Sequence, residues 1–231
     1  MMPLAAVLTD IEGTTTPIAY VRDRLFPFAR ARLADFLAVH GDDPVVQAEL
    51  AATRRLAPDT PALDTLIRWI DADAKATPLK TLQGLLWAEG YASGELQAQL
   101  YEDVAPVLRA WHKAGLALFV YSSGSVAAQR QIFGRSTAGD LAPLFSGFFD
   151  TRIGGKREQD SYDRIAISIG IPVPEILFLS DVEAELDAAA AAGLRTCQLV
   201  RADDGTIASP AHANAGTFGD VAQIFGLPLP V

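Results

Sequence analysis

Two acidic residues stand close together after a hydrophobic segment near the N-terminus. The stretch VLTDIEGTTTP, residues 7–17, carries Asp10 directly after that segment and Glu12 two positions later. A carboxylate at the mouth of a buried strand can bind a divalent cation or attack phosphorus. Because one residue separates the two acids, their side chains point the same way if the chain is extended there. Gly13 then allows a sharp turn, and we expect Thr14–Thr16 to be structural rather than catalytic.

Polar residues also follow three later hydrophobic segments. They are Ser122 and Ser123 after residues 116–121, Lys156 after residues 147–151, and Ser180 and Asp181 after residues 175–179. In an open α/β sheet, ligands bind beyond the carboxyl ends of the strands, so we expect these side chains to meet Asp10 and Glu12. Carboxylates hold a hard cation, hydroxyls and backbone N–H groups bind phosphate oxygens, and a lysine neutralises charge. The set indicates phosphoryl transfer assisted by a metal ion.

The elements that must position these residues alternate along the chain. Short, continuous hydrophobic runs predict buried parallel strands at residues 4–8, 116–121, 147–151, 175–179 and 196–200. Helical spacing lies between them, at residues 104–115, 125–134, 161–170 and 182–193, with Ser161 expected as the N-cap of the third helix. We therefore predict an α/β fold, a doubly wound and mostly parallel sheet with helices on both faces.

A long segment after the first strand has a different pattern. Its hydrophobic residues recur at helical spacing, no strand is evident, and prolines interrupt it at Pro44, Pro58, Pro61 and Pro78. This pattern predicts an all-helical module inserted into the α/β core. We expect residues 1–18 and 105–231 to form the catalytic core and residues 19–104 to form a helical cap.

The overall composition narrows the class of partner. The 231 residues carry a formal net charge of -9, which disfavours binding to nucleic acid or to an anionic membrane. No hydrophobic run reaches the roughly 20 residues of a membrane-spanning helix. The one cysteine, Cys197, excludes an internal disulfide and is expected in the core. We expect a cytoplasmic monomer that acts on a small phosphorylated molecule.

The sequence does not match the motifs of P-loop proteins, dinucleotide-binding proteins or serine hydrolases. In the segment around IGGKR, Asp150 and Arg157 occupy positions where a Walker loop needs Gly and Ser or Thr. No G-x-G-x-x-G opens a helix after a strand, which disfavours a dinucleotide cofactor. YSSGS is not a G-x-S-x-G elbow, and the three histidines have no catalytic spacing, so a serine hydrolase is disfavoured.

The order of the polar residues resembles the haloacid dehalogenase superfamily of phosphohydrolases. The carriers of this resemblance are Asp-x-Glu after the first strand, Ser after the second, then Lys156 and then Asp181. The segments DIEGTTTPI, VYSSGSVAAQRQIFG, LFLSDV and TPLKTLQGLLWAEGY more narrowly resemble the enolase-phosphatase family of methionine salvage. The resemblance covers nearly the whole chain. Most phosphatases of the superfamily have Asp two residues after the nucleophile, whereas Glu12 matches the enolase-phosphatases.

This resemblance implies a single Mg²⁺ ion and a role for each acid. Asp10 is expected to be the nucleophile and a metal ligand, and Asp181 a second ligand. Glu12 is expected to give its backbone carbonyl to the metal and its side chain to acid–base catalysis. Glu185, one helical turn beyond Asp181, is expected to support the metal site without binding the ion.

The resemblance also implies how the substrate is held. Ser122 and Ser123 are expected to bind the phosphate, and Lys156 to bridge the nucleophile and the phosphate. The family enolises 2,3-diketo-5-methylthiopentyl-1-phosphate and then removes its phosphate through an aspartyl-phosphate, leaving an acireductone. The residue that removes the proton in the first step stays open, with Glu12 as the candidate.

The segment PLKTLQGLLW of the inserted helices faces the site in this family. Lys80, Gln83 and Trp87 recur in it at helical spacing, which places them on one face of a helix. They are the candidates for substrate contact from the cap. Packing inside the helical module is the alternative for Trp87.

Three alternatives to an enolase-phosphatase stay open at this point. A relative could hydrolyse a different phosphorylated metabolite, since cap residues would set that choice. A non-catalytic module could bind phosphate without turnover. A metal-free dehalogenase is disfavoured, because Asp181 would then serve no cation.

Overall fold

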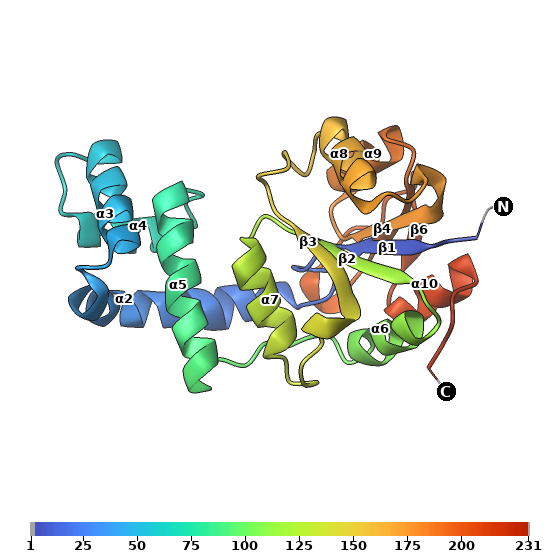
Figure 1. Cartoon of the computed structure of the whole chain (residues 1–231), viewed down its shortest axis with the longest axis horizontal. Helices are drawn as coiled ribbons and strands as arrows, with labels where there is room; N and C mark the ends of the chain where they lie inside the picture. Colours follow the sequence, from blue (N-terminus) through green and yellow to red (C-terminus); the bar gives the residue numbers. More distant parts are fainter. Residues whose placement is uncertain (1–2, 231) are drawn as a thin grey trace. The chain divides into compact units, whose positions relative to one another are not determined.

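The computed structural model describes residues 3–230 of the chain. It divides into two compact units, Met1–Ile18 with Gln97–Val231 and Ala19–Leu96. The first unit is α/β and the second is helical, each with its own hydrophobic cluster. Figure 1 shows the elements of both units.

The α/β unit is built on a six-stranded sheet in which every pairing is parallel. Its strand order is β3-β2-β1-β4-β5-β6. The strands are β1 (Ala6–Thr9), β2 (Ala117–Tyr121), β3 (Phe145–Phe149), β4 (Ile176–Ser180), β5 (Arg195–Leu199) and β6 (Ala213–Ala215). The prediction of a doubly wound parallel sheet is confirmed, and five of these strands lie where hydrophobic runs predicted them.

Helices cover both faces of this sheet. They are α6 (Val104–Lys113), α7 (Val126–Gly134), α8 (Gln159–Ile169), α9 (Glu183–Ala191) and α10 (Phe218–Phe225). In Figure 1, α8 and α9 lie on one face, and α6 and α10 lie on the other. Three short 3₁₀ turns complete the unit at Ala142–Leu144, Val173–Glu175 and Ala202–Asp204.

Alternate residues of the central strands enter different cores. In β1, Val7 joins the cluster that contains Trp111 of α6, whereas Leu8 joins the cluster that contains Ile165 of α8. Successive side chains of a strand point to opposite faces of the sheet. A strand whose two faces are both buried therefore has a continuous run of hydrophobic residues in its sequence. Phe178 of β4 follows the same rule and packs on the face of α8.

The helical unit contains four longer helices and a shorter entry segment. The entry is α1 (Ile18–Tyr20), whose first residue precedes the unit boundary, followed by the π-helical turn η1 (Val21–Leu25). The longer helices are α2 (Phe26–His40), α3 (Pro44–Leu56), α4 (Ala62–Asp71) and α5 (Thr77–Ser93). Pro44 and Pro78 lie in the first turns of α3 and α5, where a missing N–H costs nothing.

Two details differ from the sequence expectations. We expected the second domain boundary at residue 104, but the α/β unit begins again at Gln97. Backbone hydrogen bonds hold this stretch in the unit: Ala98 N–H donates to Arg135 O, and Tyr101 N–H donates to Thr15 O. Ser161 is not an N-cap, since α8 begins at Gln159; its hydroxyl donates to Gly155 O instead.

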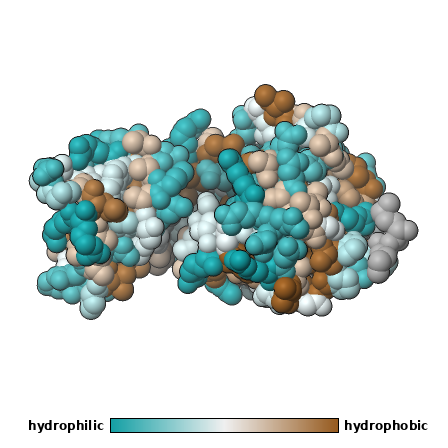
Figure 2. Space-filling view, turned by 90° about the horizontal axis from the view of Figure 1, so that it is seen from above, coloured by the Kyte–Doolittle hydropathy of each residue, from teal (hydrophilic) through white to brown (hydrophobic). Residues whose placement is uncertain are grey.

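Hydrophobic residues on the surface are scattered. The large ones that are exposed are Val39, Val45, Leu56, Leu85, Ile167, Ile207, Ile224 and Leu229. On the face shown in Figure 2, hydrophobic residues form separate areas among hydrophilic ones. Within residues 3–230, no helix combines the length and the hydrophobicity needed to cross a bilayer.

Candidate active site

The central strands bring the predicted residues to one edge of the sheet. β1 pairs with β2 through Thr9 and Val120, and with β4 through Thr9 and Leu179. The residues that follow these three strands therefore emerge side by side. They are Asp10 after β1, Ser122 and Ser123 after β2, and Asp181 after β4.

Lys156 lies between two carboxylates. Its Nζ is 2.7 Å from Asp10 Oδ1 and 2.6 Å from Glu185 Oε2, and its side chain is 10% exposed. Burial alone would lower the pKa of Lys156, but the charges of Asp10 and Glu185 outweigh that effect and raise it. Lys156 is therefore held as a cation between the two acids.

Three side-chain hydroxyl groups hold the backbone of the loop that carries Lys156. Tyr162 OH donates to Lys156 O at 2.7 Å, and Tyr121 OH donates to Gly154 O at 2.8 Å. Ser161 Oγ donates to Gly155 O at 2.8 Å. These bonds hold the backbone of a loop that has no regular structure, so the lysine is placed by the sheet and by α8.

Asp10 and Glu12 have different surroundings. Asp10 is buried, and its Oδ1 accepts the Ile11 N–H at 2.7 Å as well as the Lys156 ammonium. Glu12 is exposed. The expectation that the two side chains point the same way assumed an extended chain, but the chain turns after Asp10, with Thr15 N–H and Thr16 N–H both donating to Ile11 O.

Two of the threonines in this turn are fully buried without a partner for the hydroxyl. Thr15 Oγ1 donates to Ile11 O at 3.1 Å and supports the turn. Thr14 Oγ1 and Thr16 Oγ1 have no hydrogen-bond partner among the described residues. The structural role expected for the threonines fits Thr15 through its hydrogen bond, and fits its two neighbours only through their burial.

The surroundings of the Asp181 carboxyl are those expected of a group that binds a cation. Burial, and then the negative charge of Asp10, raise the pKa of the Asp181 carboxyl to about 7. Its Oδ1 is buried and finds no hydrogen-bond partner in the described part of the chain. An oxygen left in this state is costly unless a cation or water satisfies it.

The donor set matches Mg²⁺. Within residues 3–230, no group of three or more His, Cys, Asp or Glu side chains is placed so that it could hold a metal ion by itself. Mg²⁺ does not need one, because it commonly binds one or two carboxylates and keeps waters and phosphate oxygens as its other ligands. Asp10, Asp181 and the backbone carbonyl of Glu12 are the residues that could hold it.

Gly13 makes the close approach of Asp181 possible. A Cβ on Gly13 would lie 2.6 Å from Asp181 Cγ, and the φ of Gly13 is +71°. Both facts exclude a larger residue without a rearrangement. On the other side, Gln198 of β5 donates from Nε2 to Asp181 O at 2.9 Å.

Glu185 contacts Lys156 directly. Besides the ion pair, its Oε2 accepts the Ser180 hydroxyl at 3.0 Å. Burial and the charge of Asp10 raise the pKa of Glu185, against the lowering effect of Lys156. The family resemblance implied that Glu185 supports the metal site without binding the ion, and this stays a prediction. The structure adds that Glu185 forms an ion pair with Lys156.

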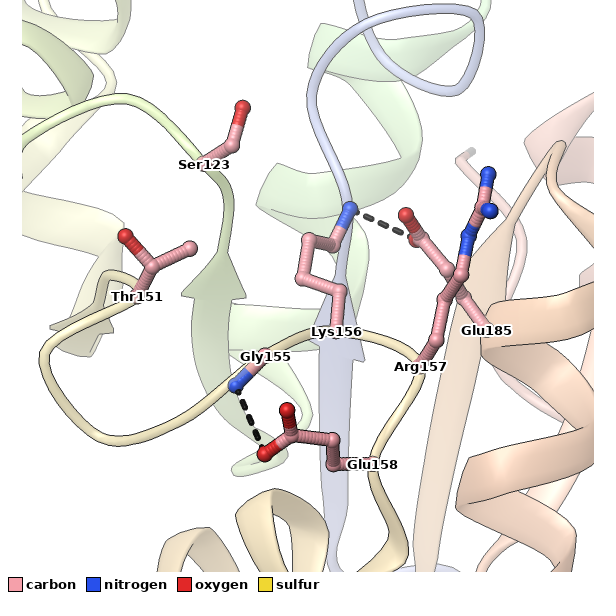
Figure 3. A pocket seen from close by; sticks show the side chains of 7 residues that line it. All are labelled: Ser123, Thr151, Gly155, Lys156, Arg157, Glu158 and Glu185. Carbon is pink, nitrogen blue, oxygen red and sulfur yellow. Dashed lines mark hydrogen bonds and ion pairs between the residues drawn. The ribbon is translucent and has the colours of Figure 1, made fainter. Parts of the chain in front are cut away.

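A pocket of about 300 Å³ opens beside this cluster. Its lining residues are Ser123, Thr151, Gly155, Lys156, Arg157, Glu158 and Glu185 (Figure 3). The side chains of Ser123, Lys156 and Arg157 extend in the same direction in that view. Ser122 is not among the lining residues, and its Oγ accepts the Gly124 N–H in a turn.

Four of the lining residues, Gly155 and the three named next, were not among the candidates predicted from the sequence. Thr151, Arg157 and Glu158 belong to the loop after β3, and no motif pointed to them. Arg157 is exposed, and it makes no ion pair with the part of the chain that is described. Its place next to Lys156 in the sequence was the available signal. Glu158 has a structural contact, since it accepts the Gly155 N–H at 3.3 Å.

The three candidates in the inserted helices lie on α5 with unequal exposure. Lys80 is exposed and Gln83 is buried. Trp87 is half-buried, donates from Nε1 to Leu25 O at 2.9 Å, and stacks with Phe26 at 6.4 Å between ring centroids. These contacts favour a packing role for Trp87 within the helical unit. Substrate contact by the three residues stays a prediction.

The structure thus combines a parallel sheet with an acid after β1, a serine after β2, a lysine paired with the first acid, and an acid after β4. The chain belongs to the haloacid dehalogenase-like hydrolases, whose family model matches residues 4–193.

Within that class, several relatives of high identity are named enolase-phosphatase E1. Proteins named enolase-phosphatase E1 are 60% identical in Granulibacter bethesdensis, with all of both chains covered, and 57% identical in Gluconacetobacter diazotrophicus, with 97% of this chain and 95% of that protein covered. In Pseudomonas syringae the identity is 51%, over 96% of this chain and 100% of the relative.

Solved structures agree with the fold. The UTR4 protein of Saccharomyces cerevisiae has a TM-score of 0.77 and 33% identity, over 93% of this chain and 98% of that one. CbbY from Rhodobacter sphaeroides, solved in complex with phosphate, has a TM-score of 0.62 over 94% of this chain and 96% of that chain. Its 18% identity supports the fold alone.

Proposed function

We propose that this chain is a Mg²⁺-dependent enolase-phosphatase of methionine salvage. The substrate would be 2,3-diketo-5-methylthiopentyl-1-phosphate and the product the acireductone 1,2-dihydroxy-3-keto-5-methylthiopentene. The observation that carries the proposal is the buried cluster of Asp10, Lys156 and Glu185 beside Asp181, in a chain whose full-length relatives are named enolase-phosphatase E1.

The phosphatase half begins with attack by Asp10. Lys156 and the Ile11 N–H both bind Oδ1, which leaves Oδ2 as the attacking oxygen. Oδ2 forms a bond to phosphorus while the bond from phosphorus to the substrate oxygen breaks, and that oxygen takes a proton from an acid. Water then attacks phosphorus, gives up a proton to a base, and regenerates the Asp10 carboxylate with release of inorganic phosphate. Glu12 is the candidate for both proton transfers.

Cationic and hydroxyl groups hold the phosphate during this step. Lys156 forms an ion pair with Asp10, the proposed nucleophile, and it also lines the pocket. Its ammonium group can therefore bind a phosphate oxygen next to Asp10. Ser123 lines the same pocket and offers a hydroxyl donor. Ser122 contributes by forming the turn that presents Ser123. When bound, Mg²⁺ supplies positive charge to the transferring phosphoryl group and to a substrate carbonyl.

The enolase half requires removal of a proton next to a carbonyl. Glu12 is exposed on the turn that carries Asp10, and it is our candidate for the base. The helical unit, Ala19–Leu96, would act as a cap for the methylthio end of the substrate, with Lys80, Gln83 and Trp87 as contacts. We further propose that the enzyme is a cytoplasmic monomer.

The test is an assay on the diketone-phosphate. Wild-type protein with Mg²⁺ should release phosphate and form a product that absorbs in the ultraviolet, and a chelator should stop both. Asp10→Asn should lower turnover by at least about 10³-fold with the fold retained, because it removes the nucleophile. Asp160→Asn, the same change at an exposed position of α8, should leave turnover unchanged.

The assay also separates the alternatives. Phosphate release without the ultraviolet signal indicates a phosphatase for another metabolite. Binding of the compound with no phosphate release at any enzyme concentration indicates a phosphate-binding module. Turnover by Asp10→Asn near the wild-type rate contradicts the nucleophile assignment.

A further inference from the structure

Arg201, two residues beyond β5, is an arginine enclosed by the α/β unit. Its side chain is 4% exposed. Nη2 donates to Thr14 O at 2.7 Å, and Nε donates to the same oxygen at 3.3 Å. Nη1 donates to Gly216 O at 3.0 Å. The guanidinium also lies over the ring of Tyr101, with Cζ 3.9 Å from the ring centroid.

The charge of this guanidinium is balanced by one acid. Asp103 accepts from Nη1 at 2.9 Å and from Nη2 at 3.3 Å. Asp103 in turn accepts the Phe218 N–H at 2.7 Å. Arg201 therefore joins the start of α6, the start of α10 and the turn after β1. A planar fork of five N–H donors suits such a junction, and a lysine could satisfy only part of it.

The turn that Arg201 holds is the one that carries the chemistry. Thr14 is four residues after Asp10 and two after Glu12, and its neighbour Gly13 lies against Asp181. The backbone of the turn is closed by Gly13 N–H to Thr16 O and by Thr15 N–H to Ile11 O, both at 2.8 Å. Thr14 O is bound from outside the turn by the Arg201 guanidinium.

We infer that Arg201 is a positioning residue for the active-site turn. It touches neither substrate nor reacting atoms, and through Thr14 it fixes the carboxylate of Asp10 and the carbonyl of Glu12 relative to Asp181. The inference rests on the proposed function of that turn. Small displacements of catalytic groups cost large factors in rate, so the effect should appear in turnover rather than in substrate affinity.

The experiment compares three variants with the wild type. Arg201→Met keeps length and removes every donor, and Arg201→Lys keeps charge and part of the hydrogen bonding. Val221→Ala, in the hydrophobic core of α10, serves as the stability control because it removes buried methyl groups and none of the hydrogen bonds of the turn. The readouts are kcat and KM on the diketone-phosphate, Tm, and hydrogen exchange of the amides of residues 11–16.

Arg201→Met should lose about 10- to 100-fold in kcat with KM within about twofold of the wild type. Arg201→Lys should recover part of that loss. The amides of the turn should exchange faster in Arg201→Met than in Val221→Ala at a similar Tm. If Arg201→Met does not fold, the same measurements on Arg201→Lys decide.

Two results would overturn the inference. One is a kcat in the Arg201 variants that follows Tm as it does in Val221→Ala. The other is unchanged exchange of residues 11–16. Failure of the wild type to release phosphate would instead remove the proposed function, and because hydrogen exchange needs no turnover it would still report whether Arg201 orders the turn.

Discussion

At the scale of single residues, Gly13 gives a sharp prediction. Gly13→Ala adds a methyl group where Asp181 lies, and it also places a non-glycine residue at a φ of +71°. We expect a stability loss of about 1–2 kcal/mol from the backbone, and a much larger loss of activity because Asp181 must move. Urea unfolding and phosphate release measure the two effects separately.

Gly170 provides the matched control. It ends α8 with a φ of +72°, and a Cβ there would meet nothing within 4 Å. Gly170→Ala should show the same backbone cost with normal activity. Equal activity in the two variants would contradict the crowding of Gly13 against Asp181.

The residue types of the site could be read from the sequence, but their contacts could not. Asp10, Lys156 and Asp181 were expected together because each follows a predicted strand. The ion pair of Glu185 with Lys156 was not expected, since helical spacing places Glu185 near Asp181 but says nothing of a lysine 29 positions earlier. Arg157 was missed because an exposed arginine in a loop has no distinguishing pattern.

At the scale of elements, Asp150 ties the end of β3 to the start of α7. It accepts the Val126 N–H at 3.3 Å and the Arg152 N–H at 3.0 Å, and it pairs with the Arg152 guanidinium at 2.8 Å. Burial opposes ionisation of Asp150, but these hydrogen bonds outweigh it and lower the pKa of the carboxyl.

A lowered pKa in the folded state predicts the direction of the pH effect. The stabilisation from Asp150 is complete above the unfolded pKa of about 4 and is lost as pH falls through the lower folded value. Asp150→Asn should therefore cost about 1–3 kcal/mol near neutral pH, and this difference from the wild type should shrink near about pH 3. Urea unfolding at both pH values measures it. A difference that is constant with pH would contradict the assignment.

Trp87 links α5 to the end of the π-helical turn. Trp87→Phe keeps an aromatic ring and loses the hydrogen bond to Leu25 O, so the helical unit should lose about 1 kcal/mol. Thermal unfolding measures this, with Trp69→Phe as the control for a ring change in the same unit. A simultaneous rise in KM would support substrate contact by Trp87, whereas an unchanged stability would contradict the hydrogen bond.

Strands and helices with strong patterns were predicted within a few residues, and weak ones were not. The runs for β1, β2, β4 and β5 are continuous because both faces are buried. β6 was not expected, since its three residues, Ala213–Ala215, lack a hydrophobic run. α10 was not expected either, although a capping box of Thr217 and Asp220 marks its start. The boundary at Gln97 depends on hydrogen bonds to distant residues, which no local pattern reports.

At the scale of the whole molecule, an acidic chain must attract an anionic substrate. The net charge is -9, and the ammonium of Lys156 is already paired with two carboxylates. Among the described residues that line the pocket, Arg157 is a cation with no ion pair, so it can attract an incoming phosphate before the phosphate reaches Lys156. Arg157→Gln should lower kcat/KM by about 3- to 10-fold at low salt with kcat nearly unchanged.

Salt provides the check on this effect. Screening should narrow the difference between Arg157→Gln and the wild type as ionic strength rises. The control is Arg109→Gln, which removes an exposed arginine of α6. It should leave kcat/KM unchanged at every ionic strength. A difference that is independent of salt would contradict electrostatic attraction by Arg157.

The chain crosses from one unit to the other after Ile18 and again before Gln97, and each unit has its own hydrophobic cluster. No strand lies between these two points, so we expect changes there to leave the register of the sheet intact. Under our proposal that the helical unit contacts the substrate, changes confined to this one module can alter substrate preference while the hydrolytic residues of the α/β unit stay in place.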